Sequence, residues 1–147
     1  MDQWNKKFLV ELQPGGNLYG LQPPAANEIA AMVEAYPNLP DQFVWFVENV
    51  GVGETQIGSH MFNLPIIMSE LHSNSRKRTS TDPQPTIAVD PLDELLMVSP
   101  SGASWYYCLR VGEEAVYCYD FATRDLSLDC KNFFEFVERF LDWDTLG

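Results

Sequence analysis

Two histidines and three cysteines are the side chains of this 147-residue chain best suited to metal binding or nucleophilic catalysis. His60 and His72 belong to no HExxH motif, and Cys108, Cys118 and Cys130 form no CxxC pair. Nothing in the spacing brings a cysteine to a histidine, as a Cys–His catalytic pair would require. We therefore predict no metal site, and we interpret the cysteines as buried, unpaired thiols that react slowly in the native protein.

Three further stretches resemble catalytic or phosphate-binding motifs only in part. Ser101 begins a predicted hairpin turn and lacks the GxSxG pattern of a nucleophile turn. The glycines of ENVGVGETQIG follow a predicted helix, which reverses the strand–loop–helix order of a P-loop. Asp90 and Asp93 could bind Mg²⁺ or act as acid and base, but they flank Pro91, so we interpret them as turn residues. The sequence thus predicts no catalytic residue and no cofactor.

The charge of the chain is strongly negative. Nine Lys and Arg against 21 Asp and Glu give a formal net charge of −12. Between residues 82 and 147 there are thirteen acidic and four basic residues, so the second half carries most of the excess. A field of this sign repels nucleic acid and anionic lipid and attracts basic partners, although acidic side chains also serve solubility alone. We expect a protein partner rather than a nucleic acid or a membrane.

Six acidic residues are the predicted partner-binding set, because each lies in or next to a predicted turn of the sheet. We expect them along one end or edge of that sheet, with little structural role: Asp93, Glu94, Glu113, Glu114, Asp120 and Asp125. The substitutions Glu113→Lys and Glu114→Lys together should then leave the thermal midpoint nearly unchanged but weaken the binding of a basic partner. Association should also slow steeply with added salt.

The first half of the chain has the pattern of two short helices. A helix is predicted over residues 27–36, capped by Asn27 and stopped by Pro37. The next run, LPDQFVWFVENVG, predicts a second helix with Pro40 at its first turn and Gly51 at its end. The two helices should meet at a tight corner.

The second half has the pattern of strands and a closing helix. TIAV, ELLMVS, SWYYCLRV and AVYCYDF predict a four-strand antiparallel meander. A three-residue loop after Val111 would place Tyr107 and Tyr119 on one face and Cys108 opposite Cys118. NFFEFVERFLDW predicts a C-terminal helix that starts near Asp129.

The middle of the chain has weaker patterns. QIGSHMF predicts a further strand, IIMSELHS predicts a strand or a helical turn, and HSNSRKRTSTDPQP predicts an exposed loop. The fold class is therefore α+β.

A composition of 46% hydrophobic residues predicts that the chain folds as one domain. We place this domain at residues 25–147 and expect residues 1–24 to form an N-terminal arm that packs on it. Trp4, Phe8 and Leu9 could instead pack on a second copy, so we expect a monomer or a weak homodimer. No stretch is long and apolar enough to span a bilayer, and the N-terminus lacks the hydrophobic run of a signal peptide. A cytoplasmic location is expected.

The order of these motifs resembles the SUKH superfamily of Smi/Knr-like proteins. In NEIAAMVEAYPNLPDQFVWFVENVGVGE, a helix with a glutamate precedes the Leu39-Pro40 pair, and a second helix carries Phe43 and Phe46. AVYCYDF is similar to a late strand of the family, and NFFEFVERFL to its closing helix. The resemblance spans residues 27–141 and implies a SUKH-like α+β fold, with short N-terminal helices, an antiparallel meander and a C-terminal helix packed on the sheet.

The resemblance also implies a function. Bacterial members are regarded as immunity proteins that bind and neutralise polymorphic toxins, often nucleases or deaminases. An acidic domain without catalytic motifs suits such a basic partner. Two alternatives stay open: a regulatory scaffold that binds an endogenous signalling or cell-wall protein, and an enzyme that uses Asp90, Asp93 or a Cys–His pair.

Overall fold

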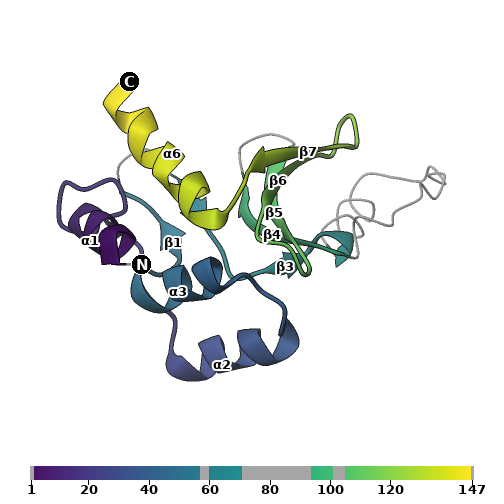
Figure 1. The fold of residues 1–147 in the computed structure, drawn as a ribbon, viewed down its shortest axis with the longest axis horizontal. Helices are drawn as coiled ribbons and strands as arrows, with labels where there is room; N and C mark the ends of the chain where they lie inside the picture. The colour runs from purple at the N-terminus through teal and green to yellow at the C-terminus, as the bar shows by residue number, and fades with distance from the viewer. Residues whose placement is uncertain (1, 57–59, 71–93, 101–104, 147) are drawn as a thin grey trace.

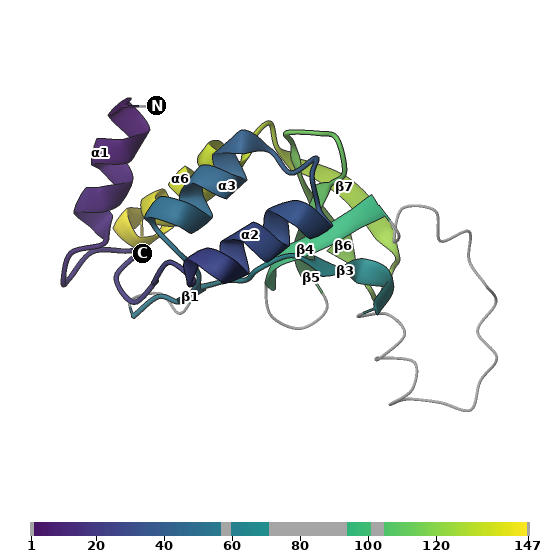
Figure 2. The same cartoon turned by 90° about the horizontal axis from the view of Figure 1, so that it is seen from below.

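The computed structural model describes residues 2–56, 60–70, 94–100 and 105–146. Helices α1 (Asp2–Glu11), α2 (Ala26–Ala35) and α3 (Asp41–Asn49) come first, and α6 (Phe133–Leu146) closes the chain. The strands between them are β1 (Gly53–Glu54), β2 (Met61–Phe62), β3 (Ile66–Ile67), β4 (Leu95–Pro100), β5 (Trp105–Arg110), β6 (Val116–Asp120) and β7 (Asp125–Cys130). Figures 1 and 2 show helices α1, α2, α3 and α6 at one side of the larger sheet. The predicted α+β fold class is confirmed.

Helices α2 and α3 lie almost where the sequence predicts them. Proline geometry explains the corner, because Pro37 follows the end of α2 and Pro40 is the residue before the first turn of α3. Gly51 ends α3 with a φ of 112°, and its backbone N–H donates to the carbonyl of Phe46 at 2.8 Å. The predicted cap was wrong: Asn27 lies inside α2, which starts after Ala25 without a side-chain cap.

The larger sheet is fully antiparallel, in the order β3-β4-β5-β6-β7. Three of the four predicted meander strands correspond to β4, β5 and β6. TIAV lies outside the described residues, and the next strand of the meander is β7, whose sequence DLSLDC was not predicted to be a strand. QIGSHMF contributes only the two residues of β2, with residues 57–59 outside the described part. IIMSELHS contains both a strand, β3, and the start of a helical turn.

The register between β5 and β6 differs by one residue from the predicted register. Cys108 pairs with Tyr117, and Cys118 pairs with Tyr107, so the two cysteines are not opposite each other. The cause is a longer connection, Val111–Ala115, in which Gly112 has a φ of 83°. A shift of one residue exchanges the faces of a strand. Tyr107 therefore faces the helices, whereas Tyr119 lies in a separate cluster on the other face with Cys108.

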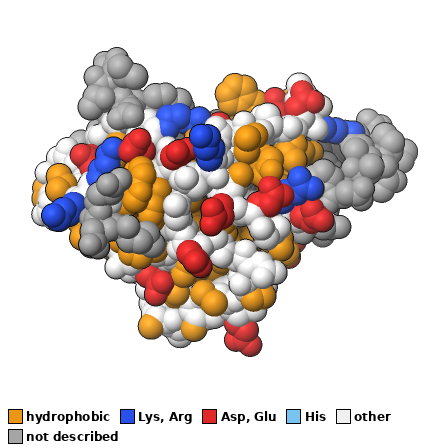
Figure 3. Space-filling model, in the orientation of Figure 1, with side chains coloured by type: hydrophobic (Ala, Val, Ile, Leu, Met, Phe, Trp, Pro, Cys, Tyr) orange, Lys and Arg blue, Asp and Glu red, His pale blue; other side chains and the backbone are white. Residues whose placement is uncertain are grey.

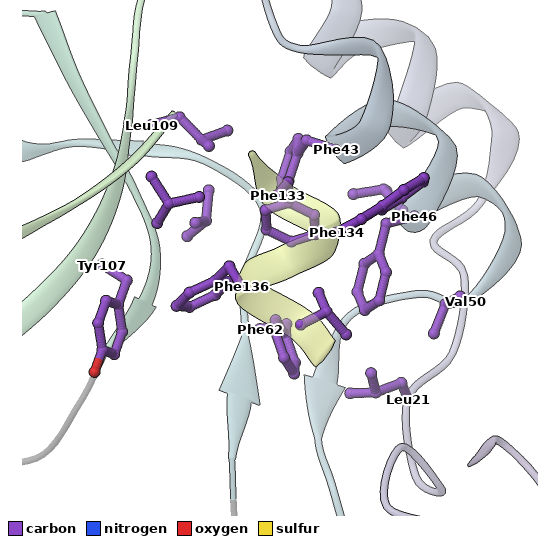
Figure 4. Packing of buried hydrophobic residues seen from close by; sticks show 14 of the residues in the cluster. Leu21, Phe43, Phe46, Val50, Phe62, Tyr107, Leu109, Phe133, Phe134 and Phe136 are labelled. Carbon is purple, nitrogen blue, oxygen red and sulfur yellow. The ribbon is translucent and has the colours of Figure 1, made fainter. Parts of the chain in front are cut away.

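Phenylalanines from α3 and α6 form the centre of the core. The ring of Phe43 packs edge-on against Phe133, with centroids 5.0 Å apart, and Phe46 packs against the same ring at 5.1 Å. Figure 4 shows these side chains pointing toward one another between the helices, with Tyr107 and Leu109 approaching from the sheet. Edge-to-face aromatic pairs add about 0.5–1.5 kcal/mol each to the burial of their apolar area. This cluster holds α3, and with it the corner, against the rest of the fold.

The C-terminal helix confirms the last predicted element. Asn132 accepts a hydrogen bond from the backbone N–H of Glu135 at 2.9 Å, which is the geometry of an N-cap. Asp129, which the sequence places near the start of this helix, accepts hydrogen bonds from Arg139 in a bidentate ion pair. The backbone N–H of Phe134 donates to Gln42 Oε1 at 2.9 Å, so a side chain of α3 also satisfies this helix end.

Helix α1 packs by its aromatic side chains against α3 and α6. Phe8 is fully buried, and its ring lies 5.3 Å from Phe134 and 5.9 Å from Phe46. Trp4 contacts the ring of Phe134 at 5.4 Å, and the Lys7 ammonium forms an ion pair with Glu138 at 2.6 Å. These contacts join the first ten residues to the main core.

Candidate partner-binding surface

The predicted partner-binding residues do not lie along one end of the sheet. Asp93 lies outside the described residues. Glu94, Glu113 and Glu114 lie at the end where the Val111–Ala115 loop connects β5 to β6, which we call the hairpin end. Asp120 and Asp125 pair with each other at the opposite end, where β6 turns into β7, which we call the turn end. The expectation of a single surface was wrong because adjacent antiparallel loops alternate between the two ends of a sheet.

Acidic side chains surround one arginine at the hairpin end. Arg110 Nε lies 3.2 Å from Glu94 Oε2 and 3.4 Å from Glu113 Oε2. The hydroxyl of Tyr117 donates a 2.5 Å hydrogen bond to Glu113 Oε1. Glu113 thus has two partners and a structural role, contrary to the expectation from sequence. Its replacement by lysine would remove both contacts, so the double substitution is not expected to leave stability unchanged.

The same contacts shift two pKa values. The hydrogen bond to Glu113 raises the pKa of Tyr117, and partial burial and the negative charge of Glu113 act in the same direction. The hydrogen bond to Glu94 raises the pKa of Arg110, with a further contribution from the charge of Glu113. Both shifts favour the protonated forms of Arg110 and Tyr117, which donate the hydrogen bonds to Glu94 and Glu113.

The carboxylate of Asp120 at the turn end serves the local backbone and side chains. Its Oδ2 accepts from Trp105 Nε1 at 2.8 Å, and its Oδ1 accepts from the backbone N–H of Ala122, also at 2.8 Å. The backbone N–H of Arg124, which has a φ of 63°, donates to the Asp120 carbonyl and closes the turn. Asp125 is exposed on the edge strand β7. Asp120 therefore has a turn-forming role.

A groove separates the hairpin loop from the corner between α2 and α3. One wall is the corner segment 37–41, and the other is formed by residues 112–114. This corner groove has a volume of about 330 Å³. Among the described residues, three carboxylates line it, those of Asp41, Glu113 and Glu114, and no Lys or Arg does. Within the described residues, neither Asp41 nor Glu114 has a basic side chain within 4.0 Å.

Beside the corner groove lies a smaller apolar pocket. Residues 37–40 line both cavities, and the smaller one, the corner pocket, has a volume of about 110 Å³. Its remaining lining residues come from the end of α2 and the residue after it, from β4, and from the end of β5 and the residue after it: Ala35, Tyr36, Leu96, Leu109, Arg110 and Val111. The hairpin end therefore combines an acidic rim with an adjoining apolar surface.

Acidic side chains are spread widely over the molecule. On the face shown in Figure 3, they are interspersed with hydrophobic and basic side chains over the whole described surface. Charge alone therefore does not single out a binding surface here. The corner groove is distinguished by its concave shape and by its three carboxylates.

The three thiols are weak nucleophiles. Burial raises the pKa of Cys108 far above its ordinary value, and burial also raises the pKa of Cys130 to about 11 and increases that of Cys118. At neutral pH these thiols are protonated, whereas catalytic cysteines have a depressed pKa. Within the described residues, no group of three or more His, Cys, Asp or Glu side chains is placed to hold a metal ion. His72 and Asp90 lie outside the described residues.

Asp41 in the corner groove and Arg110 in the adjoining corner pocket were not included in the predicted site. Asp41 follows the Leu39-Pro40 pair, which the sequence marks as a corner but not as a binding element. Arg110 is the ion-pair partner of two predicted acidic residues. The corner and the hairpin loop are far apart in the sequence, and no local pattern indicates that they meet.

Within the described residues, no helix is both long and apolar enough to cross a membrane. A comparison with curated proteins finds no match. The family model SUKH_6, described as SMI1-KNR4 cell-wall, matches residues 35–137. The matched region contains both walls of the corner groove, the whole β4–β7 meander and the start of α6. This chain therefore belongs to the SMI1-KNR4 family within the SUKH superfamily.

Proposed function

We propose that the protein is a non-catalytic, cytoplasmic binding domain that acts as an immunity protein, and that it neutralises a basic toxin of the nuclease or deaminase type by binding it. The observation that carries this proposal is the corner groove, whose rim is acidic and whose adjoining pocket is apolar. The net charge of −12 would also attract a basic partner over a long range. The raised pKa values of the cysteine thiols argue against thiol catalysis.

Charge complementarity of this kind determines mainly the rate and specificity of association. Exposed carboxylates at the rim attract a basic partner, and any charge pair that becomes buried adds affinity. The proposed surface keeps Glu94, Glu113 and Glu114 from the predicted set and adds Asp41. Asp120 and Asp125 are left outside it, because they lie at the turn end.

Co-expression of the chain with a toxin module encoded by a neighbouring gene tests the proposal. We expect the bacterial host to survive only when this chain is present, and the purified pair to form a complex. Its association rate should fall steeply between low and high salt, because salt screens the rim charges. Failure to protect the host, together with no complex at low salt, would contradict an immunity function.

One finding favours a second candidate function. The matched family model carries the description "cell-wall". A regulatory scaffold that binds an endogenous cell-wall or signalling protein would use the same acidic groove without a toxin. A partner encoded elsewhere in the genome, and no growth protection against any neighbouring toxin module, would favour this scaffold over immunity.

A further inference from the structure

The corner groove and the corner pocket adjoin, and this arrangement limits what can occupy them. Residues 37–40 line both, so an occupant that enters the groove can extend along the apolar surface beside it. Asp41 and Glu114 line the groove on opposite walls. Val111 lines the pocket and is 45% exposed, so apolar surface is available to a partner.

A long cationic side chain fits this combination. Lysine and arginine bury an aliphatic stem along apolar surface while the charged head stays at a polar rim. The volume of the corner pocket is about 110 Å³, somewhat less than the roughly 150 Å³ of an apolar cavity that binds benzene, which is the scale of such a stem. An acidic side chain of a partner would be repelled by the three carboxylates of the groove, and an apolar side chain would leave these carboxylates without a counter-charge.

The arginine beside the groove already has partners. Arg110 lines the pocket, and its guanidinium is paired with Glu94 and Glu113. Asp41 and Glu114 have no such pair within the described residues, so they are the carboxylates available to a cation from outside. Glu114 is exposed, which allows direct access.

We propose that the corner groove receives a lysine or arginine side chain from a basic protein segment, with the stem against Leu39 and Val111 and the charged head between Asp41 and Glu114. This inference rests on the proposed protein-binding function, and it adds the chemistry of the residue that the groove recognises. Charge complementarity selects this occupant over a second copy of the chain, because the groove and the chain carry the same sign.

A titration followed by NMR tests the proposal on the whole chain. The probes are three acetylated, amidated pentapeptides that differ only in the central residue: lysine, acetyl-lysine and norleucine. Acetyl-lysine keeps the stem without the charge, and norleucine keeps only the stem. We expect amide shift changes for the lysine peptide that are confined to residues 37–41 and 111–114, and at least tenfold weaker binding of the two uncharged peptides. Equal binding of all three, no binding, or shift changes elsewhere would overturn the proposal.

A matched pair of variants localises the effect. Glu114→Gln should weaken lysine-peptide binding about threefold or more, whereas Asp125→Asn, the same kind of change on an exposed residue at the turn end, should leave it unchanged. Unaltered amide shifts away from the substitution verify that both variants are folded. Equal losses in both variants would indicate a general charge effect and contradict a specific groove.

The outcomes also separate this inference from the proposed function. If the toxin is neutralised and its affinity is the same with Glu114→Gln, the immunity function stands and the lysine groove fails. If the lysine peptide binds the groove but no toxin module is neutralised, the groove stands and the immunity function fails.

Discussion

The hairpin end and the turn end of the sheet have similar acidic residues but different arrangements. At the hairpin end, Glu113 holds Arg110 and Tyr117, while Glu114 faces a groove without a basic partner among the described residues. At the turn end, Asp120 accepts hydrogen bonds from Trp105 and from the backbone of the β6–β7 turn. Carboxylates that are equivalent in the sequence therefore differ in whether their charge remains available to a partner.

The difference follows from which elements lie nearby. At the hairpin end, the α2–α3 corner approaches the loop and forms the second wall of a concavity. The described residues that line the corner groove and the corner pocket do not include any from the turn end, where Trp105 is 51% exposed. In the proposed binding surface, an acidic residue is included only where a second element of the fold faces it. This interpretation can be tested by weakening each end in turn.

The largest expected loss of stability comes from truncating Phe43, which anchors the α3 wall of the corner groove. Phe43 follows Asp41 in α3 by two positions and packs edge-on against Phe133. Phe43→Ala should lower the free energy of unfolding by about 3–5 kcal/mol, because it removes a fully buried aromatic ring. Urea denaturation followed by circular dichroism measures this.

The matched control is Leu128→Ala on the edge strand β7. Leu128 is 62% exposed, so its truncation should change the free energy of unfolding by no more than about 0.5 kcal/mol. Comparable losses for the two variants would mean that the helix corner is not anchored by the aromatic core.

Helices α2, α3 and α6 and the fold class were predictable from the sequence, because strong local signals define them, whereas the N-terminal arm was not predicted to contain helix α1. The spacing of Phe43, Phe46 and Val47 gives a helical stripe, and Pro37 and Gly51 break the chain on either side. The fixed φ angle of Pro40 marks the start of α3, where the sequence predicted a helix start and where the structure has one. Residues that fix their own backbone geometry can be interpreted without knowledge of tertiary structure.

Strand β7, the β5–β6 register and the groove could not be predicted in this way. In DLSLDC only two leucines alternate with polar residues, because an edge strand is half exposed and lacks a strong apolar pattern. The register depends on the length of the Val111–Ala115 loop, where one residue exchanges the two faces. The groove depends on two segments that meet only in the folded chain. Asp41 and Glu114 are therefore ordinary surface acids until the tertiary structure is known.

A smaller loss of stability is expected when the side chain of Asp120 at the turn end is truncated. Asp120→Ala removes the acceptor for Trp105 Nε1 and for the Ala122 amide, and should lower the free energy of unfolding by about 1–2 kcal/mol. The matched variant, Asp125→Ala, removes an exposed carboxylate and should cost no more than about 0.5 kcal/mol. Chemical denaturation of the two variants under identical conditions provides the comparison. If Asp125→Ala is the more damaging change, the turn-forming role of Asp120 is wrong.

The smallest expected effect concerns the pKa of Tyr117 at the hairpin end. The hydrogen bond to Glu113 raises the pKa of Tyr117 in the folded state, so folding favours the protonated phenol. The resulting stabilisation is fully present below the unfolded-state pKa of about 10 and is lost as the pH rises through the folded-state pKa. Glu113→Gln should therefore lower the pKa of Tyr117 and reduce the loss of stability at alkaline pH.

Carbon-13 chemical shifts of labelled tyrosine rings, followed against pH, measure this pKa directly. Glu114→Gln is the matched control, because Glu114 neighbours Glu113 in the loop but makes no contact with Tyr117 among those described. We expect its tyrosine titration to follow that of the unmodified chain. An equal decrease in both variants would mean that the general negative charge of the loop, rather than the Glu113 hydrogen bond, holds the Tyr117 proton. The division at the hairpin end between one carboxylate used for structure and one available to a partner would then be lost.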